Sequence, residues 1–359
     1  MPRILSTATA FPEHYYGQEE MSSALRTEWI KKGLDIAVFN RLQKAVTVEG
    51  RYLALEMSEY YKLDGFADSN RAWLKVALEL GEHVISDVLT KSNLAADEIN
   101  LLMSTTVTGV SVPSLEARLM NRIPFSRYLK RVPLFGLGCL AGTAGIARVA
   151  DYLKGHPDEA AILLSVELCS LTLQTDDVSI ANIISSGLFG DGAAAMVLEE
   201  CSDSRVGLVR HHHKTYTEGL RAAEIPGGCV AKWVEDFAFA PDLHHFQMDG
   251  RELLRLTLKH LPGFIEDFFE GTQYTWSDVT WTVPHQASKT GLGMIPKIAR
   301  VSPDRVVSIL ETTGNCISAS IPMALHHLAT TEGLHKGDSI LFIGTSAGYG
   351  IGALLYQHG

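Results

Sequence analysis

The stretch GLGCLAGTAGIARVADYLKG (136–155) carries the strongest pattern in the chain. Gly136 and Gly138 permit a sharp turn, and the small residues at 141, 142 and 144 allow the helix that follows to pack closely. Cys139 lies at the start of that helix, where the dipole and the free amides favour a thiolate over a thiol. The pattern predicts a strand, a turn and a helix that present Cys139 as an activated nucleophile. The alternative is a cysteine that serves as a small buried apolar residue.

The same pattern returns later in the chain as TGNCISASIPMALHHLATTEG (313–333). Asn315 follows Cys139 by 176 residues, which is also the separation of Val283 from Val107. Two further pairs of strand-like runs share nearly this offset: INLLMSTTV (99–107) with VTWTVPHQ (279–286), and EAAILLSVEL (159–168) with GDSILFIGTS (337–346). The repeat predicts a duplicated α/β fold with halves at 1–205 and 206–359. The alternative is that any α/β protein offers similar strand–loop–helix units.

Between the two copies, residues 211–250 have no counterpart and no clean period, which predicts a loop-rich excursion. The helix expected over 250–269 places Leu254, Leu258, Leu261 and Ile265 on one apolar stripe. Pro262 should kink or interrupt that helix.

Composition narrows the class of protein. The chain has 359 residues, 46% hydrophobic, with 31 Lys and Arg against 41 Asp and Glu, a net charge of −10. This balance argues against nucleic acid as a partner, because a phosphate backbone requires an excess of cations. The five cysteines are odd in number and lack C-x-x-C spacing, which favours a reducing compartment. Neither a secretory signal nor an apolar run long enough for a membrane span is present, so we expect a cytoplasmic protein.

Two other residues could join Cys139 in one site. His285 leaves the end of a strand-like run in WTVPHQAS, and Asn315 starts the second turn-helix unit. Separately, His285 could be a structural histidine and Asn315 a helix N-cap. The pseudo-twofold axis of a duplicated fold, however, would bring both side chains to Cys139. The run HHH (211–213) has no cysteine or carboxylate partner at ligand spacing, so we expect a solvated loop there and no metal site.

These residues carry a resemblance to a known family. PHQAS and GNCISAS, together with Cys139, resemble the thiolase-superfamily condensing enzymes. TTVTGVSVPSLEARLMNRI (105–123), the Cys139 stretch, LLSVELCSLT (163–172) and SGLFGDGAAA (186–195) resemble the type III, chalcone-synthase-like polyketide synthases. The C-terminal loop GTSAGYG (344–350) departs from the GFGPG-like loop of the type III synthases, and FQMDGREL (246–253) and the final GIGALLY are closer to ketoacyl synthase III. The resemblance implies a thiolase-like α/β fold, in which two pseudo-symmetric halves form a layered αβαβα core.

The resemblance also implies a reaction. Cys139 would accept an acyl group from a thioester, and His285 and Asn315 would stabilise the enolate left by decarboxylation of a malonyl-CoA-type extender. The enolate would then attack the acyl-Cys139 carbonyl in a Claisen condensation that gives a polyketide or β-ketoacyl product. Acyl-CoA and malonyl-CoA would be substrates, with no tightly bound cofactor, and the enzyme would be a homodimer.

The family's other positions map onto this chain as expectations. Phe189 would gate the cavity, while Val112, Cys169 and Thr172 would shape it, with Val112 close to the partner's cavity. Arg41, Lys44 and Arg51 would meet the phosphates of coenzyme A; each could equally belong to a solvated helix face.

Three alternatives remain open. The chain could catalyse a single condensation like ketoacyl synthase III, with a substrate held by an acyl carrier protein. It could be a non-catalytic acyl-binding homologue, although the joint presence of Cys139, His285 and Asn315 argues against this. A papain-type hydrolase also uses these three residue types but does not predict the internal repeat. A thiolase is disfavoured because GTSAGYG lacks a second cysteine.

Overall fold

Two mixed β-sheets form the frame of the molecule. The computed structural model describes residues 1–219, 221–226 and 246–359. The first sheet has the order β1 (Pro2–Ala10), β7 (Asp191–Glu200), β6 (Ala160–Leu168), β4 (Ile99–Thr105) and β5 (Lys130–Leu134). The second has the order β8 (Gly207–Thr215), β13 (Gly350–Gln357), β12 (Ser339–Thr345) and β11 (Trp281–Pro284).

The two sheets repeat one topology. In the first, β4 and β6 are parallel, and β7 then pairs antiparallel with β6 and with β1. In the second, β11 and β12 are parallel, and β13 pairs antiparallel with β12 and with β8. The strands of the first sheet come from residues 2–200 and those of the second from residues 207–357. The duplicated sheet is therefore present, while the division into domains at 205/206 stays a prediction.

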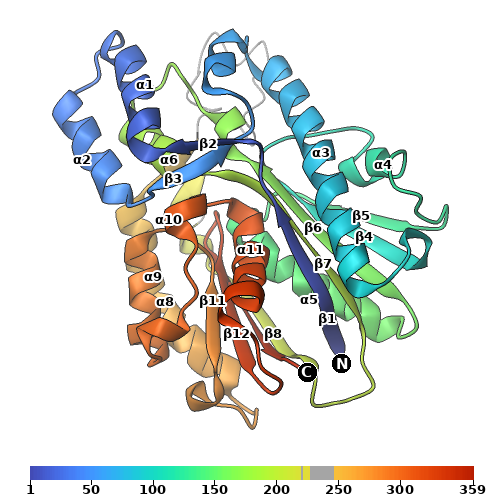
Figure 1. Ribbon diagram of the computed structural model, residues 1–359. Helices are drawn as coiled ribbons and strands as arrows, with labels where there is room; N and C mark the ends of the chain where they lie inside the picture. Colours follow the sequence, from blue (N-terminus) through green and yellow to red (C-terminus); the bar gives the residue numbers. More distant parts are fainter. Residues whose placement is uncertain (220, 227–245) are drawn as a thin grey trace.

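Helices complete five layers (Figure 1). We call the two turns that carry Cys139 and Asn315 the first and the second elbow. The helices that follow them, α5 (Ala141–Gly155) and α11 (Ser320–His327), lie between the sheets and share one apolar core with residues of both sheets. The long helix α3 (Phe66–Ser92) packs on the outer face of the first sheet. The helices α8 (Gly250–Phe269) and α9 (Lys289–Ala299) pack on the outer face of the second. This order is the expected αβαβα arrangement.

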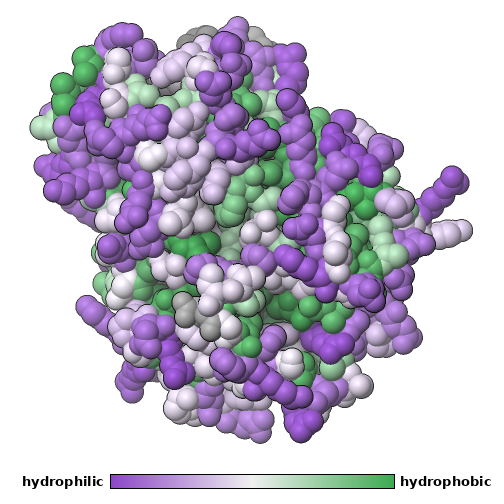
Figure 2. All heavy atoms as spheres, viewed as in Figure 1, coloured by the Kyte–Doolittle hydropathy of each residue, from purple (hydrophilic) through white to green (hydrophobic). Residues whose placement is uncertain are grey.

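Shorter elements surround the site. The strands β2 (His14–Gly17) and β3 (Gly50–Leu53) pair antiparallel, and the chain between them forms α1 (Gln18–Ile30) and α2 (Ile36–Val46). The helix α2 packs on α6 (Ile180–Leu188). Other short elements are α4 (Leu115–Leu119), α10 (Leu310–Thr313), and the strand pair β9 (Ala223–Glu224) and β10 (Gln247–Met248). Hydrophilic residues cover most of the face seen in Figure 2, and hydrophobic ones show between them in several places, among them the middle of that face.

Two local expectations are wrong. Residues 211–213 are not a loop, because they lie in β8 and pair with β13. The helix α8 continues through Pro262 without interruption, and the expected kink stays a prediction. The buried residues of α8 are Leu256, Leu261, Phe264, Ile265 and Phe268. Leu258, expected on the buried stripe, is 53% exposed. Pro262 has no N–H, so it cannot donate the helical hydrogen bond to the Leu258 carbonyl four residues earlier. Because Leu258 is exposed, water can bond that carbonyl instead.

The described part of the chain holds no helix that is long and apolar enough to cross a membrane. Within the same residues, no group of three or more His, Cys, Asp or Glu side chains is placed to hold a metal ion.

Candidate active site

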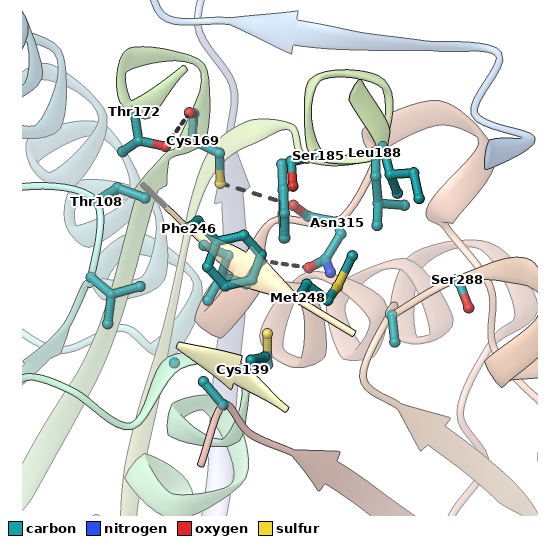
Figure 3. Close-up of a pocket in the computed structure, with 18 of the residues that line it drawn as sticks. Thr108, Cys139, Cys169, Thr172, Ser185, Leu188, Phe246, Met248, Ser288 and Asn315 are labelled. Atoms are coloured by element: carbon teal, nitrogen blue, oxygen red, sulfur yellow. Dashed lines mark hydrogen bonds between the residues drawn. The ribbon is translucent and has the colours of Figure 1, made fainter. Parts of the chain in front are cut away.

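One cavity of about 700 Å³ receives side chains from both halves of the fold. Cys139, His285 and Asn315 all line it, as do the ends of β11 and β12 and the segment around Phe246 and Met248. In Figure 3 the Cys139 thiol and the Asn315 amide point into the same space from different elements. The repeat thus brings together three residues that are far apart in the sequence.

Cys139 lies in a tight turn at the start of α5. Gly136 and Gly138 adopt positive φ angles of 85° and 51°, which only glycine adopts without strain. A single 3₁₀ turn (Gly138–Leu140) leads from Cys139 into the helix. Burial, and then the charge of Glu167, raise the pKa of the Cys139 thiol to about 12. The turn presents the sulfur as predicted, but it does not by itself ionise the sulfur.

His285 follows β11 and is only 6% exposed. Its backbone N–H donates to the carbonyl of Ile343 on β12 (2.8 Å), which fixes the residue to the sheet. Burial lowers the pKa of the imidazole to about 4, so the ring is neutral at neutral pH. Its Nδ1 is buried and has no hydrogen-bond partner among the described residues. The histidine therefore has proton-transfer capacity that the surrounding protein does not use.

The side chain of Asn315 has a defined direction. Its backbone N–H donates to the Leu188 carbonyl (2.8 Å), and its Oδ1 accepts from the N–H of Ile317 (2.9 Å). The N-cap of α11 is Ala319, so Asn315 does not cap that helix. Because Oδ1 is held by Ile317, the Nδ2 group remains to donate into the cavity.

The three groups together suit one kind of chemistry. Burial alone favours the neutral thiol of Cys139 and the neutral imidazole of His285. A proton can therefore pass from Cys139 to His285 only if the resulting thiolate and imidazolium stabilise each other. The imidazole and the Asn315 amide offer two hydrogen-bond donors to an oxygen anion that develops in the cavity. A nucleophilic sulfur, a base and two donors suit acyl transfer followed by stabilisation of an enolate.

Glu167 is a buried carboxyl that the sequence analysis did not single out. It is fully buried at the end of β6, and its oxygens accept from the Val107 N–H (3.1 Å), Thr108 Oγ1 (2.9 Å) and Ser318 Oγ (2.5 Å). Burial raises its pKa to about 7. A carboxylate in the otherwise apolar run LLSVEL was the signal available in the sequence.

The predicted cavity residues divide into two groups. Phe189, Cys169 and Thr172 line the cavity, and the ring of Phe189 lies 5.9 Å from that of Phe246. Val112 does not line the cavity of its own chain, since it is 96% exposed to the outside. Its expected place in a partner's cavity remains a prediction.

The three cations expected at coenzyme A also differ. Arg41 and Lys44 are exposed on α2. Arg51 is 3% exposed, and its guanidinium donates to Gln18 and to the carbonyls of Ser186 and Gly187. Both terminal nitrogens donate inside the protein, and Nε is buried without a partner among the described residues, so the expectation that Arg51 meets a solvated phosphate does not fit this geometry.

Comparison with known proteins identifies the family of the chain. Residues 69–216 match the family model described as FAE1/type III polyketide synthase-like protein, and residues 269–358 match 3-oxoacyl-[acyl-carrier-protein] synthase III C terminal. A 1,3,6,8-tetrahydroxynaphthalene synthase of Streptomyces peucetius subsp. caesius is 47% identical over 338 residues, which cover 91% of this chain and 85% of that protein. The chain belongs to the type III polyketide synthases.

Solved structures place this type III polyketide synthase within the thiolase-like fold. The tetrahydroxynaphthalene synthase of Streptomyces coelicolor A3(2) superposes with a TM-score of 0.88 at 24% identity over 99% of both chains. The 3-oxoacyl-(acyl carrier protein) synthase III of Pseudomonas aeruginosa PAO1 superposes with a TM-score of 0.78 over 99% of this chain and 98% of that one. The predicted fold class is confirmed, and the enzyme is a condensing acyltransferase.

Proposed function

We propose that this enzyme builds a poly-β-keto chain on Cys139 from malonyl-CoA and closes it into a fused aromatic of the tetrahydroxynaphthalene type. Hydroxyls on alternate carbons are what head-to-tail addition of two-carbon units produces. The 47% identity to a tetrahydroxynaphthalene synthase supports the product class. The single observation that supports the mechanism is that Cys139, His285 and Asn315 line one mostly apolar cavity.

The residues act in order. His285 takes the Cys139 proton as the sulfur attacks a thioester carbonyl, and coenzyme A leaves as a thiolate that is protonated in turn. Loss of carbon dioxide from a second malonyl thioester leaves an enolate, whose oxygen receives hydrogen bonds from His285 and from Asn315 Nδ2. The enolate carbon attacks the acyl-Cys139 carbonyl and expels the Cys139 thiolate, and the lengthened chain returns to that sulfur for the next round. The apolar walls keep water from the acyl-enzyme.

Separate assays of the two half-reactions test this assignment. Cys139→Ala should form no acyl-enzyme by intact-protein mass. Asn315→Ala should still be acylated but should release carbon dioxide from labelled malonyl-CoA about 10²–10³-fold more slowly. His285→Ala should impair both steps. The matched control is Cys169→Ala, which removes another cavity thiol. Wild-type decarboxylation in Asn315→Ala would exclude Asn315 from the enolate site.

The product decides between the two condensing activities. A single-round enzyme like ketoacyl synthase III would return a short β-ketoacyl thioester, and the match of residues 269–358 to that family favours it as the second candidate. Mass analysis of products from malonyl-CoA distinguishes that outcome from a fused aromatic.

We further propose that Arg41 and Lys44 meet the phosphates of coenzyme A. Arg41→Ala and Lys44→Ala should raise KM for malonyl-CoA by about 3- to 30-fold and leave kcat nearly unchanged, because such contacts are equal in ground and transition states. The control is Lys154→Ala, an exposed cation in the last turn of α5. An equal rise of KM in the control would exclude a specific role for α2.

A further inference from the structure

A second set of polar side chains lies in the cavity wall, separate from Cys139, His285 and Asn315. Tyr60 and Ser170 both line the cavity, and their hydroxyl oxygens are 2.6 Å apart. Behind them, fully buried, is Asp191, whose carboxylate is in short contact with the Ser170 hydroxyl. Among the described residues, no hydrogen bond between side chains joins these three to Cys139, His285 or Asn315.

The hydrogen bonds define a direction for protons. Asp191 accepts from the Ser170 N–H (2.8 Å), from the Ala54 N–H (2.6 Å) and from the Ser170 hydroxyl. Because Ser170 gives its proton to Asp191, its oxygen must accept the proton of Tyr60. The Tyr60 oxygen also accepts from the Leu55 N–H (3.2 Å). Burial raises the pKa of the Tyr60 hydroxyl, and the N–H of Ala54, which donates to Asp191, also acts on this oxygen and lowers that pKa by a smaller amount.

Asp191, at the inner end of this row of hydrogen bonds, is a stronger base than an ordinary carboxylate. Burial raises the pKa of Asp191 to about 6, although its hydrogen bonds with Ser170 and Ala54 and the nearby charge of Arg51 act to lower it. The guanidinium of Arg51 stays in place through its bonds to Gln18, Ser186 and Gly187. Asp191 is therefore ionised at neutral pH, and taking up one proton costs little.

We propose that Tyr60, Ser170 and Asp191 form a proton relay that deprotonates the poly-β-keto chain for ring closure, with Tyr60 as a catalytic residue and the other two acting through it. This inference rests on the proposed function. A methylene carbon between two ketones loses its proton to Tyr60 Oη, while Tyr60 passes its own proton to Ser170 and Ser170 passes one to Asp191.

The step balances without any other reagent. The resulting enolate carbon bonds to a ketone carbon further along the same chain, whose C=O π electrons become an alkoxide. The alkoxide takes a proton back through Tyr60, so Ser170 and Asp191 return to their starting states. Nothing is oxidised or reduced. Elongation at Cys139 and ring closure at Tyr60 would thus use different acid–base groups in one cavity.

The test compares Tyr60→Phe and Ser170→Ala with Tyr61→Phe. Tyr61 also lines the cavity, is 60% exposed, and has no hydrogen-bond partner for its hydroxyl among the described residues. Each purified variant receives malonyl-CoA, and coenzyme A release, fused aromatic product and lactones are measured. Melting curves check that each variant is folded.

In the two relay variants we expect coenzyme A release within about 2-fold of wild type and a fall of about 10-fold or more in the ratio of aromatic product to lactones. In the double variant the ratio of aromatic product to lactones should fall no further than in either single variant, because both substitutions break the same proton relay. Tyr61→Phe should match wild type.

An unchanged ratio in Tyr60→Phe overturns the relay and leaves the proposed function standing. Equal loss of coenzyme A release and aromatic product also overturns it, since the residues would then support elongation or folding. Wild-type enzyme that forms no aromatic product overturns the proposed function and the relay with it.

Discussion

At the scale of single residues, backbone contacts decide what the catalytic side chains can donate. The N–H of Ile317 holds Asn315 Oδ1 at 2.9 Å, and this contact turns the Nδ2 donor toward the cavity. Ile317 adopts a φ of +44°, a conformation that is unfavourable for a β-branched residue. The fold therefore accepts local strain at the residue that orients Asn315, which is common at functional sites.

The ionisation of Cys139 is a prediction at the same scale. Burial raises the thiol pKa to about 12, so thiolate becomes available at lower pH only through the imidazolium of His285. The rate of Cys139 alkylation by iodoacetamide should rise with pH. In His285→Ala this rise should occur at a pH higher by at least about one unit, because the variant has about tenfold less thiolate at a given pH.

Peptide mass mapping would show that the label is on Cys139. Cys169→Ala is the control, because burial also raises the pKa of that thiol well above its ordinary range. Coincident pH profiles for wild type and His285→Ala would show that His285 is not the base.

At the scale of elements, the two elbows meet because their residues are small. A Cβ on Gly142 would lie 2.8 Å from the Ser318 carbonyl oxygen, so α5 can approach the second elbow only with glycine there. Gly145 is in the same position against Leu163 of β6, where a Cβ would lie 2.7 Å from a methyl carbon. This close approach brings Cys139 to Asn315.

Gly142→Ala should therefore lower the free energy of unfolding by about 1–3 kcal/mol and reduce activity, because a backbone oxygen cannot move aside cheaply. The matched control is Gly263→Ala in α8, where a Cβ would meet nothing within 4 Å. There alanine should be neutral or add up to about 1 kcal/mol, as at an exposed helix position. Chemical denaturation measures both, and equal effects would contradict the packing argument.

The elements that the sequence predicts best are those with a symmetry mate. The strands at 99–105 and 281–284 and the helices after both elbows were found from the repeat, and Cys139, His285 and Asn315 follow from it. The wrong expectations lie where no mate exists: β8 at 211–213, and the face of α8 that carries Leu258. Helical spacing alone cannot tell which of two overlapping stripes a sheet will cover. Residues 211–213 of β8 pair with residues of β13 that are 139 to 143 positions away, so the pairing leaves no local signal in the sequence.

At the scale of the whole molecule, one side of the first sheet is unusually apolar. The exposed apolar face comprises Val110 (42% exposed), Val112 (96%), Tyr128 (92%), Val132 (36%), Phe135 (54%) and Leu137 (36%). It surrounds β5, which is the last strand of its sheet and pairs only with β4 among the described strands. Lys130, Arg131 and Pro133 lie in this edge strand, but exposed apolar side chains beside it are a feature that proteins normally cover.

We expect a second copy of this chain to cover that face, in a homodimer whose interface exceeds roughly 1,600 Å². A two-fold axis beside β5 would extend the sheet across both protomers and would place the fully exposed Val112 against the partner. Val112→Asp combined with Tyr128→Asp should shift the enzyme from dimer to monomer at micromolar concentration, as measured by light scattering. The dimer would have to bury two carboxylates per protomer, which costs their hydration.

The control is Leu258→Asp, which changes an exposed leucine on α8 at the outer face of the other sheet and should leave the mass unchanged. A wild-type enzyme that is monomeric under these conditions would show that the exposed apolar face has another role, and a dimer that survives both substitutions would place the interface elsewhere.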